Sequence, residues 1–395
     1  MRILALSTLF PSPVRTGFGK FVANQMRAVA ALDSVDLVMV NPIGIPPWPL
    51  SKREPYRTFE SCAATSALDG ITVYHPRFTV IPWIGGDSNP GRIARAVVPL
   101  ARRLHAEKPF DLVDAQFFFP DGPAAAIIAR ELDLPLTIKA RGSDIHYWGA
   151  RPKALAQMLA AADQAGALLT VSAALGRDMA ALGMDAGKSV AHYTGLDRDR
   201  FYVRPRDVAR AALPETLGLT LPGRAPLIVT PGALIAIKGQ ALAIEALVAV
   251  PGAHLALAGT GGDLAVLRAL VERLGLSSRV HFLGQVGHDA LPVLMSAADA
   301  VVLPSEREGL ANVWIEALAC GAPLVIPDVG GAREVVTAPS AGRIAARTPK
   351  AIAAALSELL DAPIDQAAVA ANVTRFSWQA NAASLTEIWR HAARS

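Results

Sequence analysis

The sequence predicts an α/β fold made of two doubly wound domains. Short apolar runs alternate with longer segments that carry apolar residues at three- and four-residue spacing, a pattern typical of strands followed by amphipathic helices. Most of the apolar runs are continuous, as expected of strands buried on both faces of a parallel sheet. A length of 395 residues suits two domains of ordinary size, and the runs are numerous enough for two such sheets.

The first series of predicted strands fills the first half of the chain. It starts with RILALST at residues 2–8, which is followed by the helical pattern KFVANQMRAVAAL. The later strands of this series are expected at residues 35–42, 71–76, 111–117, 136–142, 167–172 and 189–195.

The second series begins after the charged stretch DRDRFYVRPRD and a Pro/Gly-containing run. Its strands are expected at residues 227–232, 254–259, 280–286, 300–305 and 323–328, with a weaker one at 342–345. The tail has the pattern of one more amphipathic helix, which we expect to return to the first domain and dock through its tryptophans. The predicted domains are therefore residues 1–200 with helix 376–395, and residues 201–375. We expect the ligand in the cleft between them, at the carboxyl ends of the strands.

Composition excludes several classes of protein. With 52% hydrophobic and 18% charged residues the chain is an ordinary globular protein. No apolar run approaches the ~18 residues of a membrane span, and the N-terminal run MRILALSTLFPSP lacks the features of a signal peptide. The only cysteines, Cys62 and Cys320, provide neither a disulfide framework nor a cysteine zinc site, so we expect a cytoplasmic protein.

The formal net charge of +4 comes entirely from residues 1–200. Part of the excess lies at residues 91–108, where arginines and a lysine interrupt an apolar helical pattern. This pattern fits a solvated helix face, or else an amphipathic surface that rests on anionic lipid at the inner face of the membrane. Nucleic acid is not an expected partner, because no basic stretch is interleaved with aromatic residues.

Two glutamates flank a predicted strand-to-helix turn in EGLANVWIEALACGAP, residues 308–323. The free N–H groups and the dipole at the start of a helix favour an anion such as phosphate, and Gly309 permits its close approach. Carboxylates beside a phosphate are explained if Glu308 and Glu316 accept hydrogen bonds from hydroxyls on either side of it. A nucleotide sugar carries hydroxyls in both places.

These motifs resemble those of the retaining glycosyltransferases of family 4, also called group 1, whose GT-B fold has two Rossmann-like domains facing across a cleft. The resemblance is strongest over residues 227–336, where PSEREGLANVWIEALACGAPLVIPDVGGAREVV carries the E-x7-E, Ala-Cys-Gly-x-Pro and Gly-Gly-x-x-Glu motifs. The runs GALIAIKGQALAIEAL, AGTGGD, FLGQV, VSAALGRDM, TGLDRDRF and ARGSDI extend it over nearly the whole chain. RGSD and FFFPDG are similar to the subgroup that builds cell-wall and surface polysaccharides.

The resemblance implies roles for matching residues of the second domain. Glu308 would hold the donor sugar, Glu316 would hold the ribose, and Lys238 would neutralise the leaving diphosphate. The other donor-binding residues would contact the diphosphate or the base, or line the same site: Gly232, Gln285, Val286, Gly309, Leu310, Ala311 and Asn312.

In the first domain the resemblance points to two loops at strand ends. Gly17 and Gly19, in VRTGFGKF, would approach the donor, although the same glycines also fit a tight turn. Arg141 and Asp144, in KARGSDIH, would act near the sugar and the acceptor. An alternative role of Asp144 is to cap the following helix.

Two positions depart from the family pattern. Arg141 stands where most relatives have histidine, and Ala233 stands where the family usually has arginine. The second departure removes one of two cations expected on the diphosphate, a loss that costs roughly 10²-fold or more in rate if nothing compensates for it. Candidates to replace this charge are Arg307, Arg141 and Arg15.

We therefore expect a metal-independent, retaining glycosyltransferase that moves a sugar from a nucleotide diphosphate sugar to a hydroxyl of a glycan or lipid-linked acceptor. The donor, a UDP- or GDP-sugar, is a co-substrate, and no other cofactor or metal is expected. A non-catalytic nucleotide-sugar-binding subunit, motivated by Ala233, and a nucleotide-sugar epimerase remain alternatives. A dehydrogenase is discounted because AGTGGD lacks the complete G-x-G-x-x-G pattern.

Overall fold

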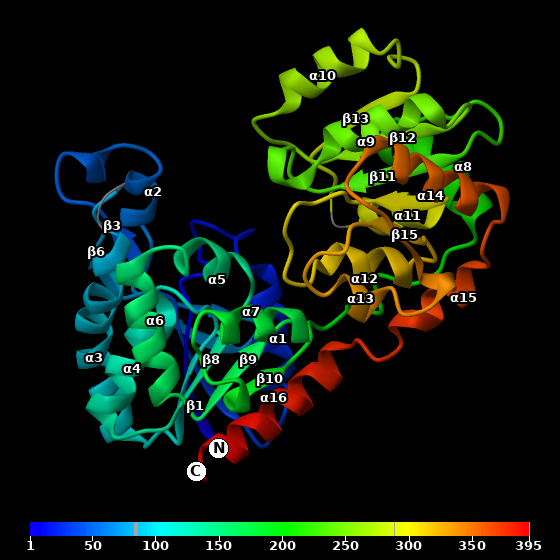
Figure 1. The fold of residues 1–395 in the computed structure, drawn as a ribbon. Helices are drawn as coiled ribbons and strands as arrows, with labels where there is room; N and C mark the ends of the chain where they lie inside the picture. Colours follow the sequence, from blue (N-terminus) through cyan, green and yellow to red (C-terminus); the bar gives the residue numbers. More distant parts are fainter. Residues whose placement is uncertain (83–85, 288, 395) are drawn as a thin grey trace. The chain divides into compact units, whose positions relative to one another are not determined.

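The computed structural model describes residues 1–82, 86–287 and 289–394. The chain forms two compact units (Figure 1). Unit 1 comprises Met1–Gly195 together with the segment from Trp378 to the end of the described chain, and unit 2 comprises Leu196–Ser377. Each unit is built around one mainly parallel sheet.

The sheet of unit 1 has eight strands in the order β10-β9-β8-β7-β1-β2-β5-β4. Central strand β1 pairs in parallel with both β2 and β7, so that Leu4 lies opposite Val38 and Val113. All pairings in this sheet are parallel except that of β4 with β5. The bounds are β1 (Arg2–Leu6), β2 (Asp36–Val40), β4 (Thr65–Leu68), β5 (Ile71–Tyr74), β7 (Leu112–Ala115), β8 (Leu136–Ala140), β9 (Ala167–Thr170) and β10 (Ser189–Ala191).

Helices cover both faces of this sheet. On one face α1 (Lys20–Ala30) packs against α16 (Trp378–Ala392), and the buried residues Met26, Leu385 and Trp389 share a core with β1. The other face carries α3 (Asn89–Glu107), α4 (Asp121–Leu132) and α6 (Pro152–Gln164), which pack on one another (Figure 1). The remaining elements are α2 (Tyr56–Glu60), α5 (Ser143–Trp148), α7 (Ala173–Ala181), and the short parallel pair β3 (Ile43–Ile45) and β6 (Arg77–Thr79).

Unit 2 has a six-stranded, fully parallel sheet in the order β13-β12-β11-β14-β15-β16. Its strands are β11 (Leu227–Pro231), β12 (His254–Ala258), β13 (Val280–Gly284), β14 (Ala300–Val302), β15 (Leu324–Ile326) and β16 (Gly342–Ile344). One face packs on α9 (Gln240–Ala246), α10 (Leu264–Arg273) and α14 (Pro349–Asp361). The other carries α8 (Arg206–Leu217), α11 (Ala290–Ala297) and α12 (Asn312–Ala319), while α13 (Ala332–Val335) and α15 (Gln366–Ala370) complete the unit.

Every apolar run predicted to be a strand contains one, which confirms the doubly wound α/β prediction. The last predicted strand of the first series is shorter than expected. It ends at Ala191 because its neighbour β9 ends at Thr170, so the following residues have no strand to pair with. The region between β2 and β5 also holds elements that were not predicted, namely β3, α2 and β4.

The predicted basic segment forms α3. Ile93 is fully buried, so the apolar face of the helix packs on the core of its own unit. On the exposed face Arg102 pairs with Glu131, and Lys108 Nζ lies 2.6 Å from a carboxylate oxygen of Asp36. This arrangement is that of a solvated helix face, and contact with anionic lipid stays a prediction. Within the described residues no helix is both long enough and apolar enough to cross a membrane.

Candidate functional site

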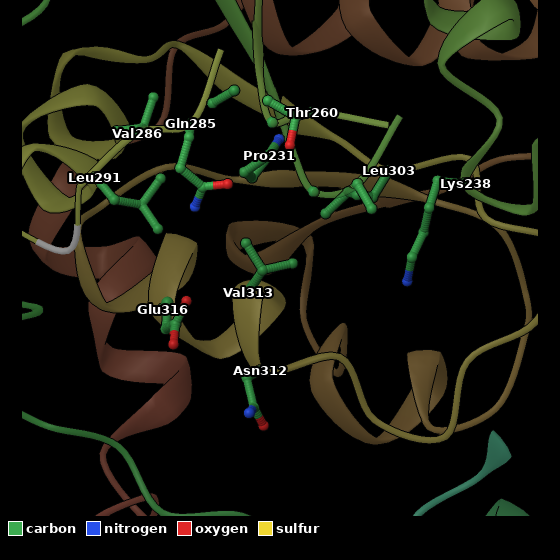
Figure 2. A pocket seen from close by; sticks show the side chains of 14 residues that line it. Pro231, Lys238, Thr260, Gln285, Val286, Leu291, Leu303, Asn312, Val313 and Glu316 are labelled. Carbon is green, nitrogen blue, oxygen red and sulfur yellow. The ribbon is translucent and has the colours of Figure 1, made fainter. Parts of the chain in front are cut away.

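Unit 2 contains a pocket of about 440 Å³ at the carboxyl ends of β11, β12 and β13 (Figure 2). This edge is where doubly wound sheets bind their ligands. The predicted donor-binding residues that line the pocket are Gly232, Lys238, Gln285, Val286, Asn312 and Glu316. Thr260, Leu291 and Val313 also line it and were not predicted.

The other predicted donor-binding residues lie elsewhere. Gly309, Leu310 and Ala311 form the turn that leads into α12, whose first helical residue is Asn312. Gly17 and Gly19 belong to unit 1, where Gly19 precedes α1. The structure therefore brings together those predicted residues of unit 2 that follow successive strands. The roles of the predicted residues that do not line the pocket stay predictions.

Lys238 and Glu308 form an ion pair beside the pocket. Lys238 closes the 3-10 turn after β11, and its Nζ lies 2.6 Å from Glu308 Oε1. The side chains are 27% and 12% exposed, respectively. The N–H of Glu306 also donates to the carbonyl of Ile237 at 2.8 Å, which joins the two loops. The two groups expected at the diphosphate and at the sugar thus lie side by side at one end of the site.

The loop that carries Glu308 depends on a close backbone approach. Gly330 has a φ of +49°, and a Cβ there would lie 2.0 Å from the carbonyl oxygen of Glu308. Next to it, the N–H of Gly331 donates to the carbonyl of Gly309 at 2.8 Å. The two glycines of the Gly-Gly-x-x-Glu motif therefore hold this loop in place by backbone packing.

Glu316 lies on the opposite side of the pocket from Lys238 and near Gln285, with Asn312 and Val313 between them (Figure 2). Its carboxylate receives no hydrogen bond from any residue that the structure describes. Burial raises the pKa of Glu316 to about 7, with Arg200 nearby lowering it in part. The pocket therefore contains a carboxylate that gains from hydrogen-bond donors on a ligand.

The glycine-rich run AGTGGD shapes the floor of the pocket. A Cβ at Gly259 would lie 1.8 Å from the carbonyl oxygen of Gly232, so only glycine permits this contact. The N–H of Gly232 donates to the carbonyl of Ala258 at 2.9 Å, and Leu234 donates to Thr260 in the same way. The glycines of this run allow close backbone packing between two strand ends. This role does not require the run to be the dinucleotide-binding motif of a dehydrogenase.

Ala233 lines the pocket with a methyl group, at the position where the family resemblance implies an arginine. Among the described lining residues, Lys238 is the one cation. Arg307 does not line the pocket, and its Nε lies 3.8 Å from a carboxylate oxygen of Glu306, so its role as a replacement charge stays a prediction. Arg200, which was not predicted, is close enough to affect the pKa of Glu316.

In unit 1 Asp144 is fully buried within its own loop. Its carboxylate accepts hydrogen bonds from the N–H groups of Phe118 at 2.8 Å, Arg141 at 3.0 Å and Gly142 at 2.8 Å. Burial raises the pKa of Asp144, and these hydrogen bonds oppose the rise. The donors precede α5, whose start has no side-chain cap, and the hydrogen bonds join the end of β8 to the end of β7. We infer that it positions the loop.

Arg141 is held next to that loop by Gln116. Its Nε donates to the Gln116 carbonyl and its Nη2 to the Gln116 side chain, both at 2.7 Å. The guanidinium also lies over the ring of Phe21, 4.9 Å from its centroid. Burial lowers the pKa of Arg141 to about 10, so the side chain is still charged at neutral pH.

Two buried groups close to this loop were missed by the sequence analysis. Lys139 Nζ lies 2.6 Å from His192 Nδ1 and 3.1 Å from Gln25 Oε1, and burial lowers the pKa of Lys139 well below its usual value. Asp121 accepts a hydrogen bond from the N–H of Thr8 at 2.8 Å, and burial raises its pKa to about 7. The signal that could have shown them is a charged residue at the end of an apolar run, in LTIKA and in FFFPD.

No group of three or more His, Cys, Asp or Glu side chains is arranged to bind a metal ion in the part of the chain that the structure describes. What the site offers is a carboxylate in an elongated pocket, an ion pair at the other end, and the start of a helix between them. Such a pocket defines a class of protein that binds a nucleotide joined to a polar group through phosphates.

Comparison with known proteins agrees with this class. The family model described as "Glycosyltransferase Family 4" matches residues 17–200, and the one described as "Glycosyl transferases group 1" matches residues 218–376. The chain belongs to glycosyltransferase family 4.

Two curated relatives illustrate the range of the family. The putative teichuronic acid biosynthesis glycosyltransferase TuaC of Bacillus subtilis is 29% identical over 343 residues, which cover 84% of this chain and 82% of that protein. The GDP-mannose-dependent alpha-(1-6)-phosphatidylinositol monomannoside mannosyltransferase of Mycolicibacterium smegmatis is 33% identical over 211 residues, which cover 49% of this chain and 54% of that one.

Solved structures show that the chain has the GT-B fold. Sucrose-phosphate synthase from Thermosynechococcus elongatus superposes with a TM-score of 0.77 at 21% identity and covers 100% of both chains. HepE of Anabaena, solved in complex with UDP, superposes with a TM-score of 0.72 at 22% identity, covering 98% of this chain and 99% of that one.

Proposed function

We propose that this glycosyltransferase is a retaining, metal-independent enzyme that moves a sugar from a UDP- or GDP-sugar to a hydroxyl of a glycan or lipid-linked acceptor. The observation that carries the proposal is the pocket of unit 2. It holds an unpaired carboxylate at Glu316 on one side and the Lys238–Glu308 pair on the other.

The pocket supports a definite orientation of the donor. Glu316 would accept hydrogen bonds from the ribose hydroxyls, and the backbone at Gln285 and Val286 would contact the base. The diphosphate would then reach the start of α12 and Lys238, which lies across the pocket from Glu316. Glu308, already within reach of Lys238, would exchange part of that ion pair for hydroxyls of the donor sugar.

In the proposed reaction the bond between the anomeric carbon and the diphosphate oxygen breaks. The acceptor oxygen forms its bond on the same face of the sugar, and its proton passes to the departing phosphate oxygen. Lys238 and the start of α12 stabilise the negative charge that develops on the diphosphate, which lowers the barrier. Because Glu308 is engaged with a cation, we assign it to holding the sugar and not to forming a covalent intermediate.

The names of similar proteins support both proposed donor types. The Mycolicibacterium smegmatis relative is named as GDP-mannose-dependent, and HepE was solved with UDP and with UDP-glucose. TuaC is named for teichuronic acid biosynthesis, and the Mycolicibacterium smegmatis relative is named for a phosphatidylinositol monomannoside. These names support an acceptor that is a surface glycan or a glycolipid.

The test is a calorimetric panel of UDP, GDP, dTDP and ADP with their common sugar conjugates, followed by NMR of the product. We expect one sugar nucleotide to bind tightly and to yield the same anomeric configuration in the product as in the donor. An inverted linkage would refute the retaining mechanism. Turnover that appears only after Ala233→Arg would show that the natural chain is a non-catalytic subunit.

Cytoplasmic location and contact with the membrane form a separate part of the proposal. Arg95 on α3 is exposed, and no acidic partner lies within ion-pair distance of it among the described residues. Flotation with vesicles of anionic lipid should carry the protein upward. Equal flotation of a variant in which Arg95, Arg102 and Arg103 are replaced by glutamine would defeat the idea.

A further inference from the structure

Unit 1 contains a second cavity, of about 200 Å³, at the carboxyl ends of β1 and β2. Its walls come from the loop that follows β1, from residues 41–44 after β2, and from α2 and β6. The cavity is smaller than the roughly 300 Å³ at which sites for drug-sized ligands begin, so it suits a single small group such as one sugar ring. Its place at the carboxyl edge of a parallel sheet favours a binding role.

A buried asparagine forms part of the wall of this cavity. Asn41 lines the cavity and is almost fully buried. Its Nδ2 donates to the carbonyl of Ser7 at 2.8 Å, which fixes the amide, while Oδ1 has no hydrogen-bond partner among the described residues. Because Oδ1 is itself enclosed by the protein, Asn41 contributes to the wall of the cavity and does not offer this oxygen to a ligand.

A cation without a counter-ion also lines the cavity. The guanidinium of Arg15 lies 3.6 Å from the ring centroid of Phe18 and 5.2 Å from that of Phe59, and these contacts hold it in place. No Asp or Glu side chain lies within ion-pair distance of it in the described part of the chain. Arginine recognises carboxylate and phosphate through two parallel hydrogen bonds, so Arg15 indicates an anionic ligand group.

The rest of the lining is aromatic and aliphatic. Tyr56 and Phe59 come from α2, and Phe78 comes from β6. Flat apolar walls with a few polar groups that fix orientation are typical of small-molecule sites. A lipid chain would satisfy these walls but would leave the Arg15 charge unpaired.

We propose that this cavity binds an anionic sugar residue of the acceptor. The carboxylate or phosphate of the sugar pairs with Arg15, and the less polar face of the ring rests on Phe59 and Phe78. The inference rests on the proposed function, since it names the class of acceptor for the same transfer reaction.

The experiment uses the full chain and ligand-observed NMR titrations. The probes are glucuronate and glucose 6-phosphate, which place the anion on a carboxylate or on a phosphate, with glucose and inorganic phosphate as their neutral and sugar-free counterparts. We expect at least one anionic sugar to bind about fivefold or more tightly than both counterparts. Which of the two binds identifies the source of the anion.

The variants are Arg15→Gln, Arg15→Lys and the control Arg177→Gln. Arg177 is an exposed arginine on α7, so its replacement removes the same charge from the same unit. Arg15→Gln should abolish the preference for the anionic sugar and leave glucose unaffected, Arg15→Lys should retain part of the preference, and Arg177→Gln should retain all of it.

Two results would overturn the inference. One is equal binding of anionic and neutral sugars by the natural chain, and the other is an unchanged preference in Arg15→Gln. Titration of UDP and GDP into the same samples keeps the two proposals apart. Nucleotide binding without anionic sugar binding refutes this inference alone, whereas the reverse pattern refutes the donor site.

Discussion

Donor binding should depend on the ionisation of Glu316, and replacing this residue with glutamine should remove that dependence. The carboxylate lies in the pocket without a hydrogen bond from any described residue, and burial raises its pKa to about 7. A protonated carboxyl group has lost much of its capacity to accept hydrogen bonds. The ribose hydroxyls should therefore bind the ionised form, and binding should lower the pKa.

The size of the effect follows from that pKa. If only the ionised form of Glu316 binds, the dissociation constant exceeds that of the fully ionised protein by a factor of about 11 at pH 6 and about 1.1 at pH 8. Affinity for the donor should therefore fall about tenfold as the pH is lowered from 8 to 6. At pH 8 the Glu316→Gln variant should bind about tenfold or more weakly than the natural chain, because it loses hydrogen bonds to a charged acceptor.

Calorimetry from pH 6 to pH 8 measures both quantities. UDP-glucose and GDP-mannose are suitable ligands because their diphosphate is blocked by the sugar and does not titrate in this range. Binding at pH 7 should release about half a proton, which appears as a dependence of the measured enthalpy on the buffer. The control is Glu272→Gln, which removes an exposed carboxylate from α10. A flat affinity from pH 6 to pH 8 in the natural chain, or an unchanged slope in Glu316→Gln, would refute the reasoning.

Three other substitutions test the architecture of the two units. Lys238→Ala should lower kcat by about 10²–10³-fold at saturating donor, since it removes the cation next to the diphosphate, and steady-state kinetics would contradict the assignment if Lys238→Ala were as active as Lys238→Arg. Trp389→Ala should lower the free energy of unfolding by about 3–5 kcal/mol in denaturant titrations, because the ring is fully buried. The control Trp48→Ala removes a ring that is 79% exposed and should change the free energy of unfolding by less than about 0.5 kcal/mol. A similar loss of stability in Trp389→Ala and Trp48→Ala would count against the docking of α16. Gly330→Ala and Gly223→Ala both place a side chain at positive φ, which alone costs about 1–2 kcal/mol, and Gly330→Ala should cost more because its Cβ would lie 2.0 Å from the carbonyl oxygen of Glu308. Only Gly330→Ala should also lose transferase activity, because its methyl group meets a backbone oxygen of the loop before α12, whereas Gly223 has open space; equal activity of the two variants would argue against the close approach.

The strands and the pocket of unit 2 were predictable because their signals are local in sequence. A parallel strand buried on both faces is a continuous apolar run, and such runs mark all the strands of unit 2. The turn before α12 is visible in the same way, since the glutamates and the glycine lie within a few residues of each other. Those features place Glu316 in a pocket at the edge of the sheet, as the structure does.

The ion pair between Lys238 and Glu308 was not predictable from such signals. The two residues are 70 positions apart, and they meet because β11 and β14 are neighbours in the sheet. Strand order depends on how the whole unit packs, so a local pattern does not reveal it. The sequence analysis assigned one residue to the diphosphate and the other to the sugar without recognising that they contact each other.

The region between β2 and β5 was missed for a different reason. Its strands β3 and β4 are three and four residues long, and their side chains are only partly buried. Neither forms a continuous apolar run, so periodicity does not identify them. This region nevertheless supplies α2 and part of the second cavity.

The two units fix the loops at their sheet edges by different physical means. In unit 2 the loop before α12 is held by backbone contact at Gly330 and by Arg347, whose Nε donates to the carbonyl of Pro304 at 2.9 Å. In unit 1 the corresponding loops are held by buried carboxylates, which accept N–H groups from Thr8 at Asp121 and from three neighbours at Asp144. Glu316 of unit 2 accepts no hydrogen bond from any described residue, whereas Asp121 and Asp144 of unit 1 are committed to the structure.

This difference determines how each carboxylate responds to pH. Asp121 has a pKa of about 7 in the folded chain and a lower one in the unfolded chain, so the folded chain holds the extra proton between them. The stability contributed by that proton is lost as pH rises from about 4 to 7, because ionisation then places an incompletely paired charge in the interior. Glu316 is raised to the same pKa by the same cause, but its oxygens face a pocket. A ligand with two hydroxyls supplies there the donors that the protein lacks, so for Glu316 ionisation favours binding of the donor, whereas for Asp121 it only opposes folding.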